Sequence, residues 1–308
     1  MTKARRVSFR RRQRWAIAPW LFISPWILGF VFFTLGPLMF SLYMSLHDWP
    51  VVGERHFVGV QNYQVMLTQD PKFWHSLGVT AKFAAIFVPL NIALSFLLAV
   101  LLNVQVHGTA LFRTAFYLPS VISGVALVMI WSWIYSKDYG LLNYGLSILG
   151  VDGPNWLGDP QWSIVAIIIA SLWGLGGTML ILLAGLQSNP KELYEAARMS
   201  GVPGWAQVVH ITLPMLSPML LFTFITSLIS AFQQLTIALL LTRGGPMNST
   251  YFFAMYIYDN AFKFHDMGYA AAMSWVMFLI ILVLSLTVLK YSAAWVHYEG
   301  EMKGGRDG

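Results

Sequence analysis

The chain contains no cysteine, so it can form neither a disulfide nor a thiolate metal site, and it has no cysteine nucleophile. Charged residues are also scarce. Asp, Glu, Lys and Arg make up 10% of the residues, whereas a soluble domain carries roughly 25%. Because 57% of the residues are hydrophobic, a soluble form would leave too much apolar surface in water. The composition therefore indicates a membrane protein.

The few charges are unevenly placed and leave six long stretches without Asp, Glu, Lys or Arg. These stretches are 15–47, 83–112, 114–136, 160–190, 199–242 and 267–289. A helix needs about 20 apolar residues to cross the hydrocarbon core, and it satisfies its own backbone groups there. We therefore predict an all-α integral membrane protein with a six-span domain over residues 15–291. The predicted spans are 17–42, 80–102, 114–135, 163–186, 213–241 and 269–291.

Lys and Arg predict the orientation of these spans. Seven of the 19 basic residues lie in the tail 1–14, ahead of the first span. Because basic residues are retained on the cytoplasmic side, this tail is predicted to be cytoplasmic, and six crossings place the tail 292–308 on the same side. Nucleic-acid binding is an alternative role for a basic tail. A topology signal accounts for it better, so we expect no nucleic-acid partner.

A polar segment, residues 187–212, separates the fourth and fifth predicted spans, and we name it the bracket. Asn189 is predicted to cap a short helix, with Pro190 at its first position and Glu192 reaching back to the cap amide. Gly201 is predicted to end this helix in a left-handed conformation.

A second short helix, "GWAQVVH", is predicted to follow Pro203, and Pro214 is predicted to open the fifth span. The bracket would then be a cytoplasmic helix–turn–helix joined to two membrane helices. From the residues alone, an amphipathic elbow that rests on lipid headgroups is an equally good interpretation.

Several motifs resemble one known family. Their central spacing is Glu195-Ala196-Ala197, three residues, Gly201, nine residues, Ile211, one residue and Leu213-Pro214. Further matching stretches are "FRTAFYLPSVIS" at 112–123, "YGLLN" at 139–143, "LTRGGP" at 241–246 and "GYAAAMSW" at 268–275. Together they resemble permease subunits of binding-protein-dependent ABC importers, in the sugar-type branch of maltose, multiple-sugar and glycerol-3-phosphate permeases. Ser200 departs from the pattern, because the family usually has Asp there.

The resemblance implies the type I ABC importer permease fold, with the bracket as the EAA coupling helix that docks into a cleft of a separate ATPase subunit. The residues implied in coupling are Glu195, Ala196, Ala197, Arg198, Gly201 and Pro214. Glu195 and Arg198 would make polar contacts, while the alanines and Gly201 would permit close packing. An ion pair from position 200 is not expected, because Ser200 is uncharged.

The resemblance also implies the partners: two ATPase subunits, a second and distinct permease subunit, and an extracytoplasmic solute-binding protein. It places the chain in a bacterial or archaeal inner membrane. ATP and Mg would be held by the ATPase subunits, and we expect no cofactor or metal on this chain. A phosphate-binding G-x-x-x-x-G-K-[ST] loop is absent from the sequence, so we expect a non-catalytic subunit.

Polar residues inside spans are costly in lipid and usually face the bundle or a cavity. By resemblance, the fifth span lines a sugar site, with Gln234 as the first candidate. On a continuous helix Gln233 and Gln234 would lie about 100° apart, so both would face the interior only obliquely. Paired glycines at 176–177 would leave room or permit a bend. The candidate pathway residues are Gln234, Gln233, Ser230, Ser227, Trp173, Gly177, Ser171, Ser123 and Asn91. Interhelical packing is the alternative role for each of them.

The central turns of the spans carry no Asp, Glu, Lys or Arg, which favours a neutral sugar or polyol over a charged solute. A glycerol-3-phosphate permease is the main alternative within the family. An ion-driven secondary transporter would commonly carry an embedded charge. A membrane-bound enzyme would need clustered titratable groups, and only Glu192, Glu195 and His210 come near that.

Overall fold

The computed structural model describes residues 20, 22–103, 108–292 and 296. The basic tail predicted at 1–14 lies outside the described residues, as does the tail 292–308 except for Ser292 and Val296.

Most described residues are helical, and four helices are long and apolar enough to cross a membrane. These are Phe22–Ser45, which includes η1 (Val31–Leu35) and α2 (Gly36–Ser45), then α4 (Pro71–Leu102), Gly204–Phe232 and α14 (Met267–Ser292). Two bent pairs also qualify: α5 (Thr109–Val121) with α6 (Gly124–Ile134), bent by 101°, and α8 (Pro160–Leu172) with α9 (Gly176–Ser188), bent by 48°. The prediction of an all-α membrane protein is confirmed, with four to six candidate spans.

Shorter elements connect these helices. They are β1 (His47–Asp48), β2 (His56–Phe57), α3 (Gln61–Thr68), α7 (Leu141–Ile148), α10 (Lys191–Met199), η3 (Ala238–Thr242), α13 (Phe253–Tyr258) and η4 (Asp259–Lys263). The helix Gly204–Phe232 consists of α11 (Gly204–Gln207), the π-helical turn η2 (Val208–Thr212) and α12 (Leu213–Phe232).

The chain divides into two compact units. One combines the described residues up to Val65 with Asn260–Trp275. Within it, β1 and β2 form an antiparallel hairpin, and the amide of Met267 donates to the carbonyl of Trp49 over 3.0 Å. The side-chain amide of Asn62 donates to two carbonyls at the end of α2, those of Ser45 and His47.

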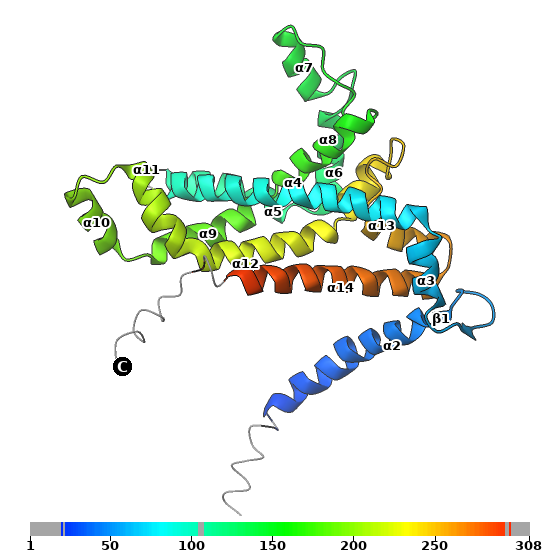
Figure 1. The fold of residues 1–308 in the computed structure, drawn as a ribbon. Helices are drawn as coiled ribbons and strands as arrows, with labels where there is room; N and C mark the ends of the chain where they lie inside the picture. The colour runs from blue at the N-terminus through cyan, green and yellow to red at the C-terminus, as the bar shows by residue number, and fades with distance from the viewer. Residues whose placement is uncertain (1–19, 21, 104–107, 293–295, 297–308) are drawn as a thin grey trace, which may run out of the picture. The chain divides into compact units, whose positions relative to one another are not determined.

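The other unit, Met66–Asp259 with the chain from Val276 onward, contains the bracket and most of the candidate pathway residues. Within it α4 packs against both α9 and α12, and α5 packs against α9. One end of α4 contacts α13, and the bracket helices α10 and α11 lie beyond its other end (Figure 1). Near the bracket, Ala99, Leu182 and Leu216 are fully or almost fully buried between α4, α9 and α12.

Local chemistry explains why α4 begins at Pro71, ahead of the predicted residue 80. The carboxylate of Asp70 accepts hydrogen bonds from the amides of Lys72 and Phe73, at 2.9 and 3.2 Å. Pro71 occupies the first helical position, where a missing N–H costs nothing. The hydropathy pattern could not detect these turns, because they carry polar residues.

Candidate functional site

Side-chain hydrogen bonds fasten the bracket to the ends of two long helices. The hydroxyl of Tyr194 on α10 lies 3.1 Å from the side-chain amide of Asn189, which follows α9, and 3.1 Å from the hydroxyl of Thr212 in η2. The side-chain amide of Gln207 donates to the carbonyl of Val202 at 2.8 Å. The bracket is therefore held to both flanking helices by polar contacts.

The first bracket helix ends as the sequence predicted. Gly201 has a φ of +71°, in the left-handed region. The amide of Val202 donates to the carbonyl of Ala197 at 2.9 Å, and the amide of Gly201 donates to that of Arg198 at 3.0 Å. This pair of bonds is a Schellman motif, which closes the last turn and reverses the chain sharply.

The predicted start of that helix is wrong by one residue. Pro190, with ψ near 125°, takes the cap position, and α10 begins at Lys191 with no side-chain cap. Asn189 precedes a proline and is therefore extended. Its amide donates to Tyr194 instead, so the expected reciprocal bond from Glu192 is absent from the described cap.

The two alanines of the motif face different surroundings. Ala197 is buried within the subunit, whereas Ala196, Glu195, Arg198 and Gly201 are exposed. Large apolar side chains are exposed beside them, and these are Leu193 (45%), Met199 (90%), Trp205 (70%) and Val209 (47%). The exposed surface of the bracket therefore carries large apolar side chains among charged ones. We name these four residues the apolar bracket face.

The second bracket helix is not a separate element. α11 continues through η2 into α12 as one helix of 29 residues. Pro214 lies inside this helix, directly after the π-helical turn, rather than opening a new one. Because proline has no N–H and its ring crowds the preceding turn, a wider turn at that point keeps the helix unbroken.

Three helices are interrupted in this unit. The interruptions are at 122–123 between α5 and α6, at 173–175 between α8 and α9, and at 233–235 between α12 and η3. Their flanks touch. A Cβ on Gly124 would lie 3.0 Å from Thr236, and one on Gly176 would collide with the carbonyl of Phe116. The chain bends by 48° at 173–175, directly before Gly176 and Gly177, which themselves lie in the first turn of α9.

The interruption at 233–235 corrects the expectation for the two glutamines. α12 ends at Phe232, so Gln233 and Gln234 do not lie on a continuous helix. Gln233 is exposed, while Gln234 is half-buried and its side-chain amide donates to the hydroxyl of Ser171 at 3.3 Å. None of the residues in the three interruptions is charged.

Asn91 and Ser227 lie elsewhere in the unit and contact each other. The amide of Asn91 on α4 donates to the hydroxyl of Ser227 on α12 at 3.1 Å and to that of Thr178 on α9 at 3.4 Å. Asn91 and Ser227 are buried, with 5% and 7% of their surfaces exposed. Such a contact joins three helices.

The remaining candidates sit near the interruptions. Ser123 is exposed and caps α6, its hydroxyl accepting from the amide of Ala126 at 3.4 Å. Ser230 is exposed, and a Cβ on Gly177 would meet nothing within 4 Å. The ring of Trp173 is half-buried within the interruption at 173–175.

Sequence reasoning assigned no site role to Trp131, which the structure places against Trp173. The two rings meet edge to face, with centroids 5.8 Å apart. Trp131 is 9% exposed, and among the described residues its indole N–H has no hydrogen-bond partner. No periodicity or motif distinguishes such a tryptophan from an ordinary core residue. Within the described ranges no group of three His, Cys, Asp or Glu could hold a metal.

Comparison with known proteins gives one consistent family. Residues 108–296 match the model of the "Binding-protein-dependent transport system inner membrane component" family. The chain is 38% identical over 289 residues to the probable ABC transporter permease protein YesP of Bacillus subtilis, covering 92% of this chain and 93% of that one.

Other relatives have named solutes. Identity is 39% over 282 residues to the lactose transport system permease protein LacF of Rhizobium radiobacter, covering 89% of this chain and 93% of that protein. Identity is 34% over 286 residues to the trehalose/maltose transport system permease protein MalF of Thermococcus litoralis, covering 92% of this chain and 96% of that protein.

The fold matches a crystal structure of a bacterial ABC transporter involved in the import of the acidic polysaccharide alginate. The TM-score is 0.80 with 24% identity, and the match covers 92% of this chain and 99% of that one. The chain therefore belongs to the binding-protein-dependent transport system inner membrane components, the non-catalytic permease subunits of ABC importers.

Proposed function

We propose that this subunit forms half of the translocation pathway for a sugar or oligosaccharide that an extracytoplasmic binding protein delivers. Relatives named for lactose and for trehalose/maltose transport, each matched over about nine-tenths of the chain, support a carbohydrate solute. In this proposal the six candidate spans cross a bacterial or archaeal inner membrane with both termini in the cytoplasm.

The observation that most supports this proposal is the meeting of three interrupted helices around uncharged polar side chains. Interrupted membrane helices are tolerated where they line a cavity or a solute site. Gln234 and Ser171 offer an amide and a hydroxyl at this place, and Trp173 offers an indole face. Sugars are bound by such neutral donors, acceptors and aromatic rings.

The same chemistry argues against a phosphorylated solute. A phosphate group is usually held by Arg or Lys, and the residues of the three interruptions include neither. We therefore favour a neutral carbohydrate over glycerol-3-phosphate. The candidate pathway residues in this proposal are Gln234, Gln233, Ser171, Trp173, Gly177, Ser230 and Ser123, with Asn91 and Ser227 as helix-joining residues.

The bracket is the proposed docking site for the ATPase subunit. Its apolar bracket face, Leu193, Met199, Trp205 and Val209, is exposed. Exposed apolar side chains of this size mark an interaction surface when they are contiguous. Glu195, Arg198 and exposed Ala196 would contact the ATPase beside this face, while Gly201 would leave room for it. ATP binding by two such ATPase subunits would move the bracket.

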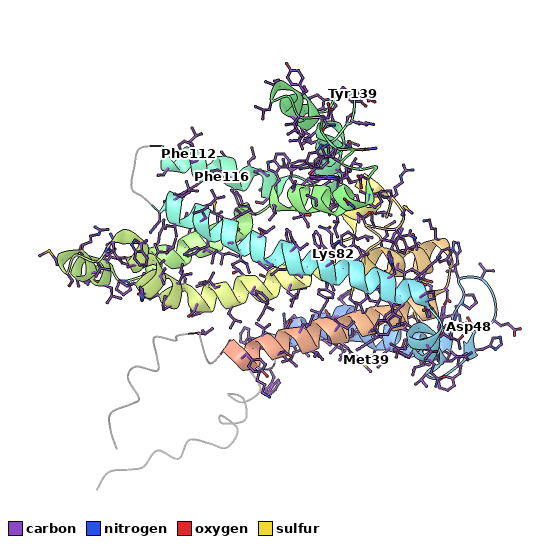
Figure 2. All side chains as sticks on the ribbon, turned by 45° about the horizontal axis from the view of Figure 1, so that its top comes forward. Met39, Asp48, Lys82, Phe112, Phe116 and Tyr139 are labelled. Carbon is purple, nitrogen blue, oxygen red and sulfur yellow. The ribbon has the colours of Figure 1, made fainter. Side chains whose placement is uncertain are left out.

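A second, distinct permease subunit would complete the pathway. The α5 helix has large apolar rings exposed one turn apart, with Phe112 at 57% and Phe116 at 40% (Figure 2). In the membrane this face can pack on a partner helix or on lipid. Its position beside the interruption at 122–123 favours the partner.

The experiment that tests the proposal has two steps. The cognate binding protein is screened by thermal shift against neutral sugars and glycerol-3-phosphate, because a ligand stabilises the folded state in proportion to its saturation. The complete importer is then reconstituted in liposomes, and uptake of the identified solute is measured with and without ATP. Uptake of a neutral sugar that requires both ATP and the ATPase subunits is the expected result. Uptake by this chain without them would contradict the proposal.

A further inference from the structure

A cavity of about 1080 Å³ lies at the bracket end of the second unit. One side of the cavity is formed by the C-terminal ends of α4 and α9 and the N-terminal end of α5. The other side is formed by α10, α11 and η2. None of the candidate pathway residues lines this cavity, whereas Glu195 and Arg198, two of the proposed ATPase contacts, do.

One face of α10 lines the cavity. Lys191, Tyr194, Glu195 and Arg198 all contribute to its wall, and their spacing of three, four and seven residues puts them on a single helical face. Met199, which belongs to the apolar bracket face, does not line it. The helix α10 therefore turns charged side chains toward the cavity, while Met199 lies outside the cavity wall.

Arg113 lines the cavity from α5. It is the one charged residue between Lys82 and Lys137 in the sequence. One Nη donates to the carbonyl of Leu102 at 2.8 Å, which closes the C-terminal end of α4. The Nε of Arg113 is buried, and among the described residues it has no hydrogen-bond partner. A guanidinium carries five N–H donors in a planar fork, so the known bond leaves capacity for an oxygen ligand.

The cavity wall carries three cations, Arg113, Lys191 and Arg198, against one carboxylate, Glu195. Within the described part of the chain, none of these three cations forms an ion pair with a carboxylate. Like charges around one cavity disfavour each other, and a bound anion relieves that repulsion.

We propose that this cavity binds a phosphate group, from either an anionic lipid headgroup or a soluble phosphate compound. Arg113 would supply the planar fork that matches phosphate oxygens, and Lys191 and Arg198 would supply point charges. A phosphate held in this way would connect α5 to α10. It would thus tie the bracket to the inner end of the bent pair α5–α6.

This proposal does not depend on which solute is transported. It also differs from the coupling proposal, because Arg113 and Lys191 take no part in ATPase docking there, although Arg198 belongs to both proposals.

The test uses the complete importer, assembled with its partner subunits. In one arm it is placed in nanodiscs of phosphatidylcholine containing increasing phosphatidylglycerol, and native mass spectrometry counts the retained phosphatidylglycerol. In the other arm, inorganic phosphate is titrated in uncharged detergent while the unfolding temperature is followed. Each arm compares the unmodified subunit with Lys191→Gln and with the matched control Lys82→Gln, an exposed lysine of α4 (Figure 2).

Removing one cation near a phosphate is expected to weaken binding about fivefold. Loss of phosphatidylglycerol in Lys191→Gln, with retention in Lys82→Gln, supports the proposal and identifies a lipid. If phosphate raises the unfolding temperature less in Lys191→Gln than in Lys82→Gln, the proposal is supported and the ligand is a soluble phosphate compound. Arg113→Lys keeps the charge and removes the fork, so it should weaken either ligand further.

Two results would overturn the proposal. One is that neither phosphatidylglycerol nor phosphate binds in a way that depends on Lys191. The other is that a photo-crosslinker at Thr109, in the cavity wall, reacts with an ATPase segment that fills the space while no anion is retained. That second result would assign the cavity to a protein partner.

Discussion

The side-chain amide of Asn91 on α4 donates a hydrogen bond to the hydroxyl of Ser227 on α12 across 3.1 Å. Its second bond, to Thr178 at 3.4 Å, reaches α9. One buried amide, with 5% of its surface exposed, therefore connects the three helices that pack most closely in this unit.

Asn91→Ala should lower the free energy of unfolding by about 1 kcal/mol, because interhelical hydrogen bonds in membranes contribute about that much. Unfolding in mixed micelles measures the loss. Ser230→Ala is the control, since Ser230 is exposed on α12. Equal stability of the two variants would show that the amide does not hold the helices together.

Gly176 and Gly177 are neighbours with opposite tolerance for a side chain. A Cβ on Gly176 would collide with the backbone of Phe116 and Tyr117, whereas one on Gly177 would meet nothing within 4 Å. Gly176→Ala should therefore cost about 1–3 kcal/mol through overpacking. Gly177→Ala should be neutral or stabilise α9 by up to about 1 kcal/mol. Thermal unfolding of the two variants checks this, and the reverse order would refute the close contact of α9 with α5.

Gly201 permits a test that separates backbone strain from docking. Its φ of +71° disfavours alanine more than aspartate, because Asp enters the left-handed region more readily. If docking matters, Gly201→Asp should be the worse variant, since an unpaired charge buried in an interface costs at least about 2 kcal/mol and weakens ATPase binding about 30-fold.

Sugar-stimulated ATPase activity of the reconstituted importer measures this effect, with membrane insertion of each variant checked first. Gly201→Ala serves as the matched control. Greater loss in Gly201→Ala than in Gly201→Asp would assign the role of Gly201 to the turn alone.

Gln234→Ala should lower the uptake rate about fivefold, which corresponds to one hydrogen bond of about 1 kcal/mol to the solute. Binding of the ATPase subunits should not change, because Gln234 lies just past Phe232, the end of the helix Gly204–Phe232 that is far from the bracket. Ser132→Ala, an exposed position on α6 whose hydroxyl bonds its own helix at Met129, is the control. Unchanged uptake in Gln234→Ala would remove Gln234 from the pathway.

The sequence is sufficient to predict helices and the Gly201 turn, because hydropathy and glycine chemistry act locally. It misplaces the interruptions, since nothing in "SAFQQLT" distinguishes a break at Gln233 from a continuous polar face. The helix end there depends on what surrounds the residues. For the same reason, Trp173 is identifiable as a candidate while its neighbour Trp131 is not.

In the bracket, too, features set by local chemistry can be predicted from the sequence, whereas features set by tertiary contacts cannot. Its motif predicts a helix, a turn and a second short helix; the first helix and the turn occur, while the second helix is the start of the long helix Gly204–Phe232. The cap at Asn189 is wrong because the hydroxyl of Tyr194 competes for that side chain, and such a contact requires the folded arrangement. Gly176, whose intolerance for a side chain comes from Phe116 on another helix, is likewise invisible in a single sequence.

The length of the helix Gly204–Phe232 determines how far its tip moves when the helix tilts. Its 29 residues make a rod about 43 Å long, with Trp205 near one end and the interruption at 233–235 immediately after the other. A tilt of about 5° would displace the far tip by about 4 Å at that length. In the proposed mechanism, a small rotation imposed at Trp205 is thus large enough to change the width of the solute passage where the rod ends.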